Sequence, residues 1–230
     1  LVKVICSTIC GAQIGEITGM KGPDPYLPHL LGHEGCGDVV EIGPGVTQVK
    51  LGDRVVMHWR KGRGIEAMPV QYQLGDTVIG AGPVATFAEQ VVVSENRLTT
   101  ISDVVKPEVA SLMGCAITTA LGLINNEAQL KIGQSVAVIG GGGVGACIVL
   151  GAAMVGAYPI IGIDREVAKA TIMQRRGATH VHIHNYQRSI AHVIKQITGS
   201  RGVDVLIDTT GDVGMISNGY DAVASGGRMV

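Results

Sequence analysis

The chain has 230 residues, enough for one large domain or two modest ones, and 46% of them are hydrophobic while 16% are charged. That balance predicts a folded core and excludes a disordered chain. The formal net charge is −1, so neither nucleic acid nor an anionic membrane is expected as a partner. Five cysteines, an odd number at wide spacings, favour reduced thiols or metal ligands and a reducing, cytoplasmic location.

Short β-branched runs separated by Gly, Pro and Asp turns dominate the first 115 residues, which is typical of a mostly β module. A capped helix start at Pro107 and a helical run over 115–123 would join this module to the next. Residues 57–86 are expected to form a loop. The predicted strands are 1–9, 37–42, 53–58 and 87–93.

After Ile132 the pattern alternates between strands and helices with short connections, which is typical of parallel βαβ units. We therefore predict an α/β fold with domains at 1–116 and 117–230. Residues 226–230 are predicted to form a turn that feeds a strand of three residues, so we expect the chain to be a segment of a longer protein. The predicted strands are 135–139, 159–163, 179–183 and 203–208, and the predicted helices start at Val144, at Glu166, near Ser189 and before Gly226.

One apolar stretch, residues 135–163, has no charged side chain and the length of a membrane span. Four consecutive glycines from Gly140 oppose a helix there, because each costs roughly 1 kcal/mol relative to alanine, and Pro159 interrupts its far end. We expect no membrane segment. The chain opens with Leu1, so a targeting sequence stays an open question.

The stretch Gly140–Gly145 matches the pattern G-x-G-x-x-G between a predicted strand and a predicted helix. The first glycine permits a tight turn, the second lets a pyrophosphate approach the backbone, and the third lets the helix pack on the strand. Asp164 ends the next predicted strand, 19 residues after Gly145, where a carboxylate accepts hydrogen bonds from an adenosine ribose. The pattern predicts a dinucleotide-binding loop, and the alternative is a structural glycine turn with a surface aspartate.

The Asp164 carboxylate favours NAD over NADP because it would repel a 2′-phosphate, whereas Arg165 could pair with that phosphate and keeps NADP as the second choice. The segment 208–211 ends another predicted strand on the cofactor side. The residues expected to contact the cofactor are Gly140, Gly142, Gly143, Val144, Gly145, Asp164, Arg165, Lys169 and Thr209.

Cys10, His33 and Cys115 share no short ligand spacing, so general metal-site rules say little about them, and core packing is the alternative. The run from Gly32 to Gly43, Gly32-His33-Glu34-Gly35-Cys36-Gly37-Asp38-Val39-Val40-Glu41-Ile42-Gly43, continues with Gly45-Val46 and Gly52-Asp53-Arg54-Val55. This long run resembles the signature of the zinc-containing alcohol dehydrogenases of the medium-chain dehydrogenase/reductase superfamily.

The resemblance implies a GroES-like, mostly β catalytic domain followed by a Rossmann domain with a doubly wound parallel sheet, both incomplete at the chain ends. It implies one catalytic zinc held by Cys10, His33 and Cys115, with Glu34 as a neighbouring or exchangeable fourth ligand, and substrate in the cleft between the domains. The reaction would be hydride transfer between an alcohol and NAD, or the reverse reduction of a carbonyl. The family's second, structural zinc is not expected, since 57–86 contains no cysteine. We also expect a homo-oligomer, a dimer or a tetramer.

The chain departs from the family's pattern beside the first ligand. Ala12 replaces the serine or threonine that takes the substrate's proton, so either the Thr119 hydroxyl or water alone would serve in its place. Gln13 replaces an aspartate that orients the ligand histidine, so His33 would receive a neutral partner. By alignment from Gly52, Trp59 falls where related enzymes place a wall of the substrate pocket, and ordinary packing is the alternative. Ala12, Gln13 and the different loop at 57–86 together favour a larger polar substrate, such as a polyol or a sugar-derived alcohol.

Other candidate residues receive structural interpretations. Cys6, Cys36 and Cys147 are expected to be core or near-core thiols, His58 a strand residue, and the alternating His180, His182 and His184 part of a strand and its end. Two other functions stay open: a zinc-free quinone or enoyl reductase of the same superfamily that uses NADPH, and an NAD-binding protein without turnover.

Overall fold

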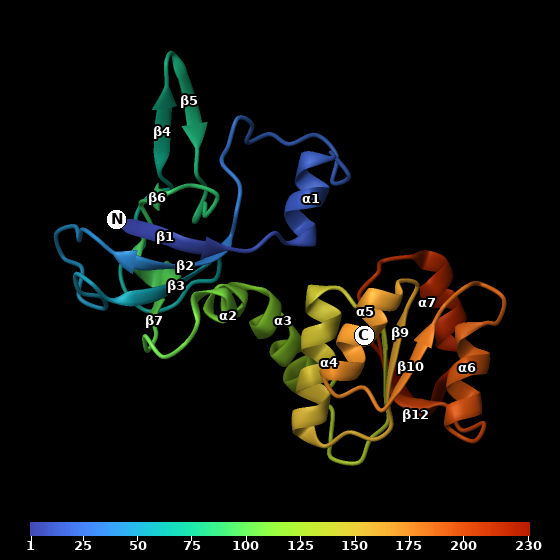
Figure 1. Cartoon of the computed structure of the whole chain (residues 1–230). Helices are drawn as coiled ribbons and strands as arrows, with labels where there is room; N and C mark the ends of the chain where they lie inside the picture. The colour runs from blue at the N-terminus through green and yellow to red at the C-terminus, as the bar shows by residue number, and fades with distance from the viewer. The chain divides into compact units, whose positions relative to one another are not determined.

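The computed structural model describes residues 1–230, and its backbone contacts divide the chain into two compact units, Leu1–Ala116 and Ile117–Val230. We call these the N-terminal and the C-terminal unit and describe each by itself (Figure 1). The elements of the N-terminal unit are β1 (Val2–Ser7), α1 (Gly11–Ile17), β2 (Glu34–Val39), β3 (Arg54–His58), β4 (Gln71–Leu74), β5 (Thr77–Gly80), β6 (Gln90–Val91), η1 (Glu95–Arg97), β7 (Leu98–Thr100), α2 (Pro107–Ser111) and η2 (Leu112–Gly114).

An antiparallel sheet with the strand order β6-β1-β2-β3-β7 forms the N-terminal unit. Alternate residues of its strands face opposite sides, as the pleat requires. Val55 and Met57 pack with Val2 in one cluster of buried residues, while Val56 packs with Cys36 and Ala110 of α2 in another. The sheet is therefore covered on both faces in this region.

The expected strands 1–9 and 87–93 are shorter, as β1 and β6, and two expectations differ more from the structure. Strand β2 begins at Glu34 rather than at 37, because Glu34 pairs with His58 and Gly35 with Met57 of β3. Residues 71–80, expected as a loop, form the hairpin β4–β5 around a two-residue turn at Gly75 and Asp76 (Figure 1). Gly75 has φ +59°, a conformation that such turns require and glycine adopts readily.

Helix α1 was not predicted. It contains Gly11 and Gly15, which are poor helix formers, so its local signal is weak. Its one buried residue is Gln13, whose side chain is hydrogen-bonded to residues of another segment. The helix is thus stabilised by tertiary contacts rather than by its own sequence.

The C-terminal unit is built on a parallel sheet with the strand order β10-β9-β8-β11-β12. The predicted alternation of strands and helices is confirmed. Its elements are α3 (Ala116–Gly122), which begins at the unit boundary, η3 (Leu123–Glu127), β8 (Val136–Ile139), α4 (Gly143–Val155), β9 (Ile160–Asp164), α5 (Val167–Arg175), β10 (His180–Ile183), α6 (Ile190–Ile197), β11 (Val203–Asp208), α7 (Val213–Tyr220) and β12 (Val223–Met229).

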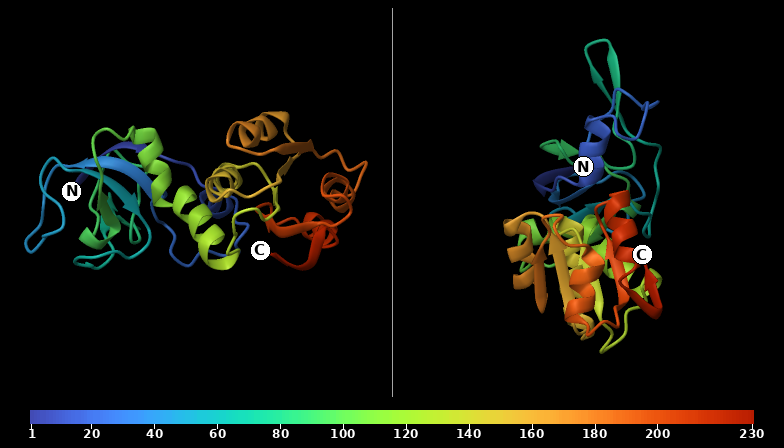
Figure 2. Two further views of the ribbon diagram at one scale, coloured as in Figure 1. Left: turned by 90° about the horizontal axis from the view of Figure 1, so that it is seen from below. Right: turned by 90° about the vertical axis from the view of Figure 1, so that its right-hand side faces the viewer.

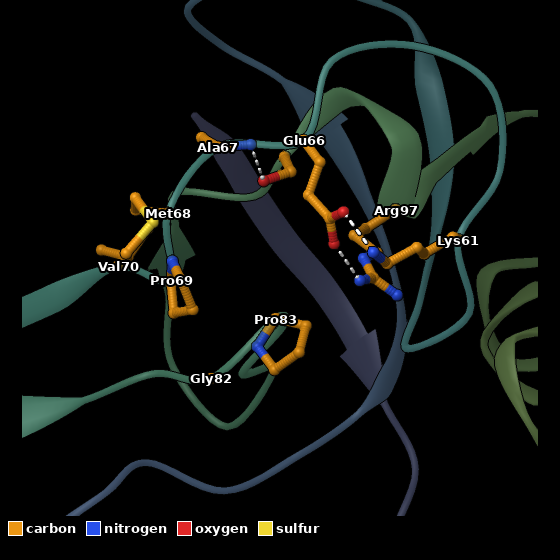
Figure 3. Close-up of a pocket in the computed structure, with 10 residues that line it drawn as sticks. Lys61, Glu66, Ala67, Met68, Pro69, Val70, Gly82, Pro83 and Arg97 are labelled. Atoms are coloured by element: carbon orange, nitrogen blue, oxygen red, sulfur yellow. Dashed lines mark hydrogen bonds and ion pairs between the residues drawn. The ribbon is translucent and has the colours of Figure 1, made fainter.

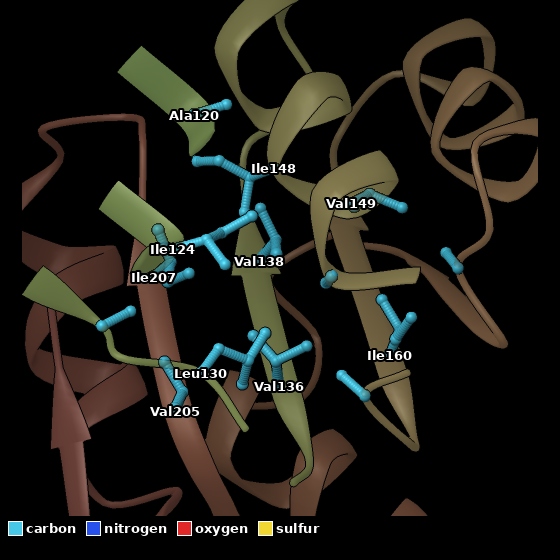
Figure 4. Packing of buried hydrophobic residues seen from close by; sticks show 14 of the residues in the cluster. Ala120, Ile124, Leu130, Val136, Val138, Ile148, Val149, Ile160, Val205 and Ile207 are labelled. Atoms are coloured by element: carbon cyan, nitrogen blue, oxygen red, sulfur yellow. The ribbon is translucent and has the colours of Figure 1, made fainter. Parts of the chain in front are cut away.

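Helices cover both faces of this sheet (Figures 1 and 2). Val136 and Val138 of β8 pack against Ile148 of α4, with Ile124 in the same cluster (Figure 4). Ile139 of the same strand belongs to a second cluster, which includes residues of α6 and α7. Burial on both faces explains why the strands are apolar throughout, and the doubly wound α/β architecture is confirmed.

The last strand differs from its prediction. The turn expected at 226–227 lies inside β12, which begins at Val223. Val203 pairs with Val223 and Val205 with Arg228, so five residues of β12 span the distance that two residues of β11 cover. Gly226 has φ +76° in this irregular stretch. The glycines therefore bulge out of the strand instead of preceding it.

The apolar stretch 135–163 folds as strand, glycine-rich turn, helix and strand. No single helix of the structure is both long enough and apolar enough to cross a membrane. The segments Pro107–Gly114 and Ala116–Glu127 reach that length only when joined across a bend of 52°.

Candidate functional site

Four potential metal ligands lie together in the N-terminal unit. Cys10, His33, Glu34 and Cys115 each offer one ligand atom, and these atoms lie within 4.8 Å of one another. Tetrahedral zinc with ligand bonds of about 2.0 to 2.3 Å separates its ligand atoms by roughly 3.5 Å, so small side-chain adjustments would close the site around an ion. The residues come from the start of α1, the start of β2 and the turn between η2 and α3.

The ring of His33 is held from one side and left unpartnered on the other. Its Nδ1 lies 3.2 Å from Nε2 of Gln13. Its Nε2 is buried and has no hydrogen-bond partner. Buried polar atoms are nearly always paired, so a lone imidazole nitrogen beside two thiols and a carboxylate fits a metal ion. The contact with Gln13 is the neutral partner that the sequence predicts.

Glu34 is anchored through its backbone. Its carbonyl accepts hydrogen bonds from Ser7 Oγ at 3.0 Å and from Thr86 Oγ1 at 3.1 Å. Its side chain is buried, and Oε2 accepts a hydrogen bond from the Ala116 N–H at 3.3 Å. This last contact ties the carboxylate to the residue that follows Cys115.

Gly114 lets the Cys115 segment approach Glu34. A Cβ at position 114 would lie 2.6 Å from the Met57 carbonyl oxygen and 2.7 Å from Cβ of Glu34, closer than real contacts allow. Any larger residue would therefore push Cys115 away from the other three ligands.

The structure places the remaining predicted residues of this site as follows. Ala12 lies in α1. Trp59 follows β3 with 48% of its surface exposed, and its carbonyl accepts a hydrogen bond from Arg97. Thr119 lies in α3, in the C-terminal unit, and is exposed. His58 belongs to β3, where Nε2 lies 3.0 Å from Oγ1 of Thr99, and burial lowers its pKa.

The glycine-rich stretch connects β8 to α4 in the C-terminal unit. A Cβ at Gly145 would lie 1.8 Å from the Gly140 carbonyl oxygen, so the helix packs on the turn only because residue 145 has no side chain. At Gly142 and Gly143, by contrast, a Cβ would meet nothing within 4 Å. The loop thus combines one tightly packed glycine with two that face open space at the start of a helix of 13 residues, the arrangement an anionic phosphate needs.

Asp164 and Thr209 both contact this loop. Oδ2 of Asp164 accepts a hydrogen bond from the Gly141 N–H at 2.6 Å, and Oδ1 accepts one from Glu166 N–H at 2.8 Å. Oγ1 of Thr209 lies within hydrogen-bond distance of the carbonyls of Ile139, at 3.0 Å, and Gly140, at 3.1 Å. Sequence reasoning missed both contacts, because it placed Asp164 and Thr209 only against a bound cofactor.

Other predicted cofactor residues have partners of their own. Arg165 donates to the hydroxyl of Tyr186 at 3.0 Å, and Lys169 forms an ion pair with Glu166 at 2.7 Å. Val144 is the second residue of α4, directly after Gly143. His180 and His182 lie in β10, and the rings of His182 and His184 contact each other edge to face.

Two family models match the chain. The alcohol dehydrogenase GroES-like domain matches residues 1–103, and the zinc-binding dehydrogenase domain matches residues 143–230. The S-(hydroxymethyl)glutathione dehydrogenase of Synechocystis sp. is 32% identical over an alignment that covers 98% of this chain and 68% of that protein. An Escherichia coli protein of the same name is 31% identical with the same coverage.

Solved structures of dehydrogenases and reductases share the fold of this chain. The apo form of zinc-dependent alcohol dehydrogenase 2 from Streptococcus pneumonia superposes with a TM-score of 0.84 at 25% identity, covering 100% of this chain and 67% of that one. Benzyl alcohol dehydrogenase from Acinetobacter calcoaceticus gives 0.81 at 27%, covering 99% and 67%. Escherichia coli quinone oxidoreductase shares the fold, with 0.80 at 24%, covering 99% and 62%. By its relatives and its domain matches, the chain belongs to the zinc-containing alcohol dehydrogenase family of the medium-chain dehydrogenase/reductase superfamily.

Proposed function

We propose that this protein is a zinc- and NAD-dependent oxidoreductase that transfers a hydride between an alcohol, polyol or sugar-derived alcohol and the nicotinamide. The observation that carries this proposal is the buried, unpartnered Nε2 of His33 within 4.8 Å of the ligand atoms of Cys10, Glu34 and Cys115. Two thiolates and an imidazole are typical ligands of a catalytic zinc.

Cys10, His33 and Cys115 would hold the ion, with Glu34 as a fourth ligand that can give way to substrate. Bound zinc supplies a Lewis acid that polarises a substrate oxygen. The chain's own part is positional: Gln13 fixes the imidazole plane, and Ser7 and Thr86 fix the Glu34 backbone. Trp59 is proposed as a wall of the substrate pocket. Thr119 is proposed as the hydroxyl that handles the substrate's proton, since Ala12 has none.

The C-terminal unit would bind the dinucleotide at the start of α4. Gly142 and Gly143 leave open space for the pyrophosphate, Gly140 and Gly145 shape the turn, and Val144 is proposed as a further contact. Asp164 holds a negative charge beside Gly141, which supports NAD over NADP. The bound cofactor supplies the hydride acceptor. Arg165, Lys169 and Thr209 are proposed as further contacts.

Metal content and turnover test this proposal together. Zinc is measured in wild type, in Cys10→Ser and in Cys6→Ser, whose thiol lies outside the four-residue group and contacts Ser111. We expect about one zinc in wild type and in Cys6→Ser and a large loss in Cys10→Ser. Equal metal in Cys10→Ser would overturn the ligand assignment.

An absorbance assay at the nicotinamide band then compares ethanol-like alcohols, polyols, sugar-derived alcohols and S-(hydroxymethyl)glutathione, the compound in the name of the two relatives cited above. We expect reduction of NAD with a polar alcohol. Turnover of quinones with NADPH by a zinc-free protein would instead favour a quinone reductase, and tight NAD binding without turnover of any alcohol would favour a binding protein.

A further inference from the structure

A pocket of about 390 Å³ lies in the N-terminal unit, lined by none of the four potential metal ligands. Figure 3 shows it between two kinds of wall. Lys61, Glu66 and Arg97 lie on one side, and Met68 and Pro69 on the other, with Pro83 facing the space between them. The pocket therefore has a charged end and an apolar end.

The charged end holds more positive than negative groups. Glu66 alone pairs with both cations, with Lys61 at 2.5 Å and with Arg97 at 2.6 Å. The Arg97 side chain is only 7% exposed, so its charge is poorly solvated. Its one ionic partner is the Glu66 carboxylate, which also pairs with Lys61. Arg60 and Arg63 are exposed on the same short segment. The chain as a whole has a net charge of −1, so this excess is local.

The segment that carries these cations is fixed to the rest of the unit. The buried carboxylate of Glu95 accepts hydrogen bonds from the N–H groups of Thr47, Gln48 and Ile65. The Gly62 N–H donates to the Asn96 carbonyl at 2.7 Å. These contacts hold both ends of the segment, so Lys61 and Glu66 are presented on a defined backbone rather than on a free loop.

We propose that this pocket binds a small organic anion, a carboxylate or a phosphate, that carries an apolar body. The anionic head would contact Lys61 and Arg97 and would displace one of the two Glu66 carboxylate oxygens from its cation. The apolar body would cover Met68, Pro69 and Pro83. A charge-assisted contact to a nearly buried arginine is strong, and the apolar wall adds burial that inorganic anions lack. The site requires neither zinc nor the cofactor.

Isothermal titration calorimetry on the full chain tests this binding, with hexanoate, hexyl phosphate, inorganic phosphate and the neutral hexanamide as probes. Trp59 is the only tryptophan, and its carbonyl is bound by Arg97, so its fluorescence provides a second readout. We expect saturable binding of hexanoate or hexyl phosphate and weaker binding of hexanamide and inorganic phosphate. The stronger of the two hexyl anions identifies the head group.

Two variants should move the affinity in opposite directions. Lys61→Gln removes a cation and should weaken hexanoate binding about threefold, whereas Glu66→Gln removes the competing carboxylate and should strengthen it about threefold, as expected for one partly exposed charge. Lys21→Gln, which removes an ion-paired lysine elsewhere in the same unit, should leave the affinity for hexanoate unchanged.

The same titration on Cys10→Ser separates this pocket from the proposed metal site. Binding that persists in Cys10→Ser supports the pocket even if the proposed reaction fails. The proposal is overturned if hexanamide binds as tightly as both anions, if Lys61→Gln and Glu66→Gln change the affinity in the same direction, or if no probe binds at millimolar concentration.

Discussion

Nε2 of Gln13 lies 3.2 Å from Nδ1 of His33 and 3.0 Å from Oε2 of Glu16, so a neutral amide lies between this side of the imidazole and the Glu16 carboxylate. Oε1 of the same amide accepts the Gly32 N–H. Because an amide nitrogen only donates, Nδ1 of His33 is the acceptor in this arrangement, and zinc binding through Nε2 requires the amide oxygen to face Nδ1 instead. A negative charge in contact with a ligand histidine makes it a better metal ligand. In this chain the Glu16 carboxylate contacts Gln13 and not His33.

Exchanging the two side chains should therefore strengthen zinc binding. The double variant Gln13→Glu with Glu16→Gln keeps the net charge and the side-chain lengths, but moves the carboxylate next to His33. We expect zinc affinity to rise about tenfold. Competition with a chromogenic chelator measures it, and Glu16→Gln alone is the control. An affinity no higher in the double variant than in wild type would show that the charge beside His33 does not matter.

Asp24 and His29 form an ion pair whose strength should depend on pH. Nδ1 of His29 faces the Leu30 carbonyl at 2.9 Å and Nε2 faces Oδ2 of Asp24 at 2.7 Å, so both ring nitrogens face acceptors. The hydrogen bonds to the Leu30 carbonyl and to Asp24 raise the pKa of His29 above 6.5. The hydrogen bond from the Tyr26 backbone N–H and the one from His29 lower the pKa of Asp24 below 3.8.

The sign follows from these directions. Because the pKa of His29 is raised in the folded state, its stabilisation of the fold is fully present below pH 6.5 and is lost as the pH rises through the folded pKa. Because the pKa of Asp24 is lowered, its stabilisation is present above pH 3.8 and is lost as the pH falls through the folded pKa. Urea unfolding of wild type and His29→Gln should thus differ more at about pH 5 than at about pH 8. A difference that is constant with pH, or that grows toward pH 8, contradicts this prediction. Asp24→Asn should flatten the dependence.

Asp204 should stabilise the C-terminal unit at neutral pH. Its Oδ2 accepts hydrogen bonds from the backbone N–H and the Oγ of Ser135, both at 2.8 Å, and the ion pair with Arg201 is the largest cause that lowers its pKa to about 2. This contribution is present above pH 3.8 and is lost as the pH falls toward 2.

We expect Asp204→Ala to lower the free energy of unfolding by about 1 to 3 kcal/mol at neutral pH. The exposed Asp221→Ala serves as the control and should cost about 0.5 kcal/mol or less. Denaturant unfolding measures both. Equal effects of the two substitutions would show that the contacts of Asp204 are not stabilising.

Two glycines of the loop after β8 should respond differently to alanine. Gly145→Ala puts a Cβ 1.8 Å from the Gly140 carbonyl oxygen and should destabilise the fold by about 3 kcal/mol or more, because backbone must move. Gly142→Ala meets no atom and should leave the melting temperature near that of wild type while weakening NADH binding. Thermal melts and NADH fluorescence check the pair. Unchanged NADH affinity in Gly142→Ala would argue against a pyrophosphate at this position.

Local patterns in the chain were enough for most of the C-terminal unit, although they misplaced the start of its last strand, β12. Its strands are buried on both faces and its helices follow at regular intervals, so each apolar run is visible in sequence. The glycine-rich loop could also be predicted from sequence, because the close contact that requires a glycine at position 145 is with Gly140, only five residues earlier. The ligand set, by contrast, came from a resemblance and not from spacing.

Long-range contacts decided the rest. Helix α1 has weak local propensity and depends on Gln13, which bonds to Gly32 and His33 about 20 residues away. Glu95 holds a segment 30 to 48 residues earlier in the chain. No window of sequence contains both partners of such a contact, whereas a helix or strand period repeats within a few residues. For that reason periodicity is readable along the chain, and the grouping of Cys10, His33, Glu34 and Cys115 exists only once the sheet and its connections have formed.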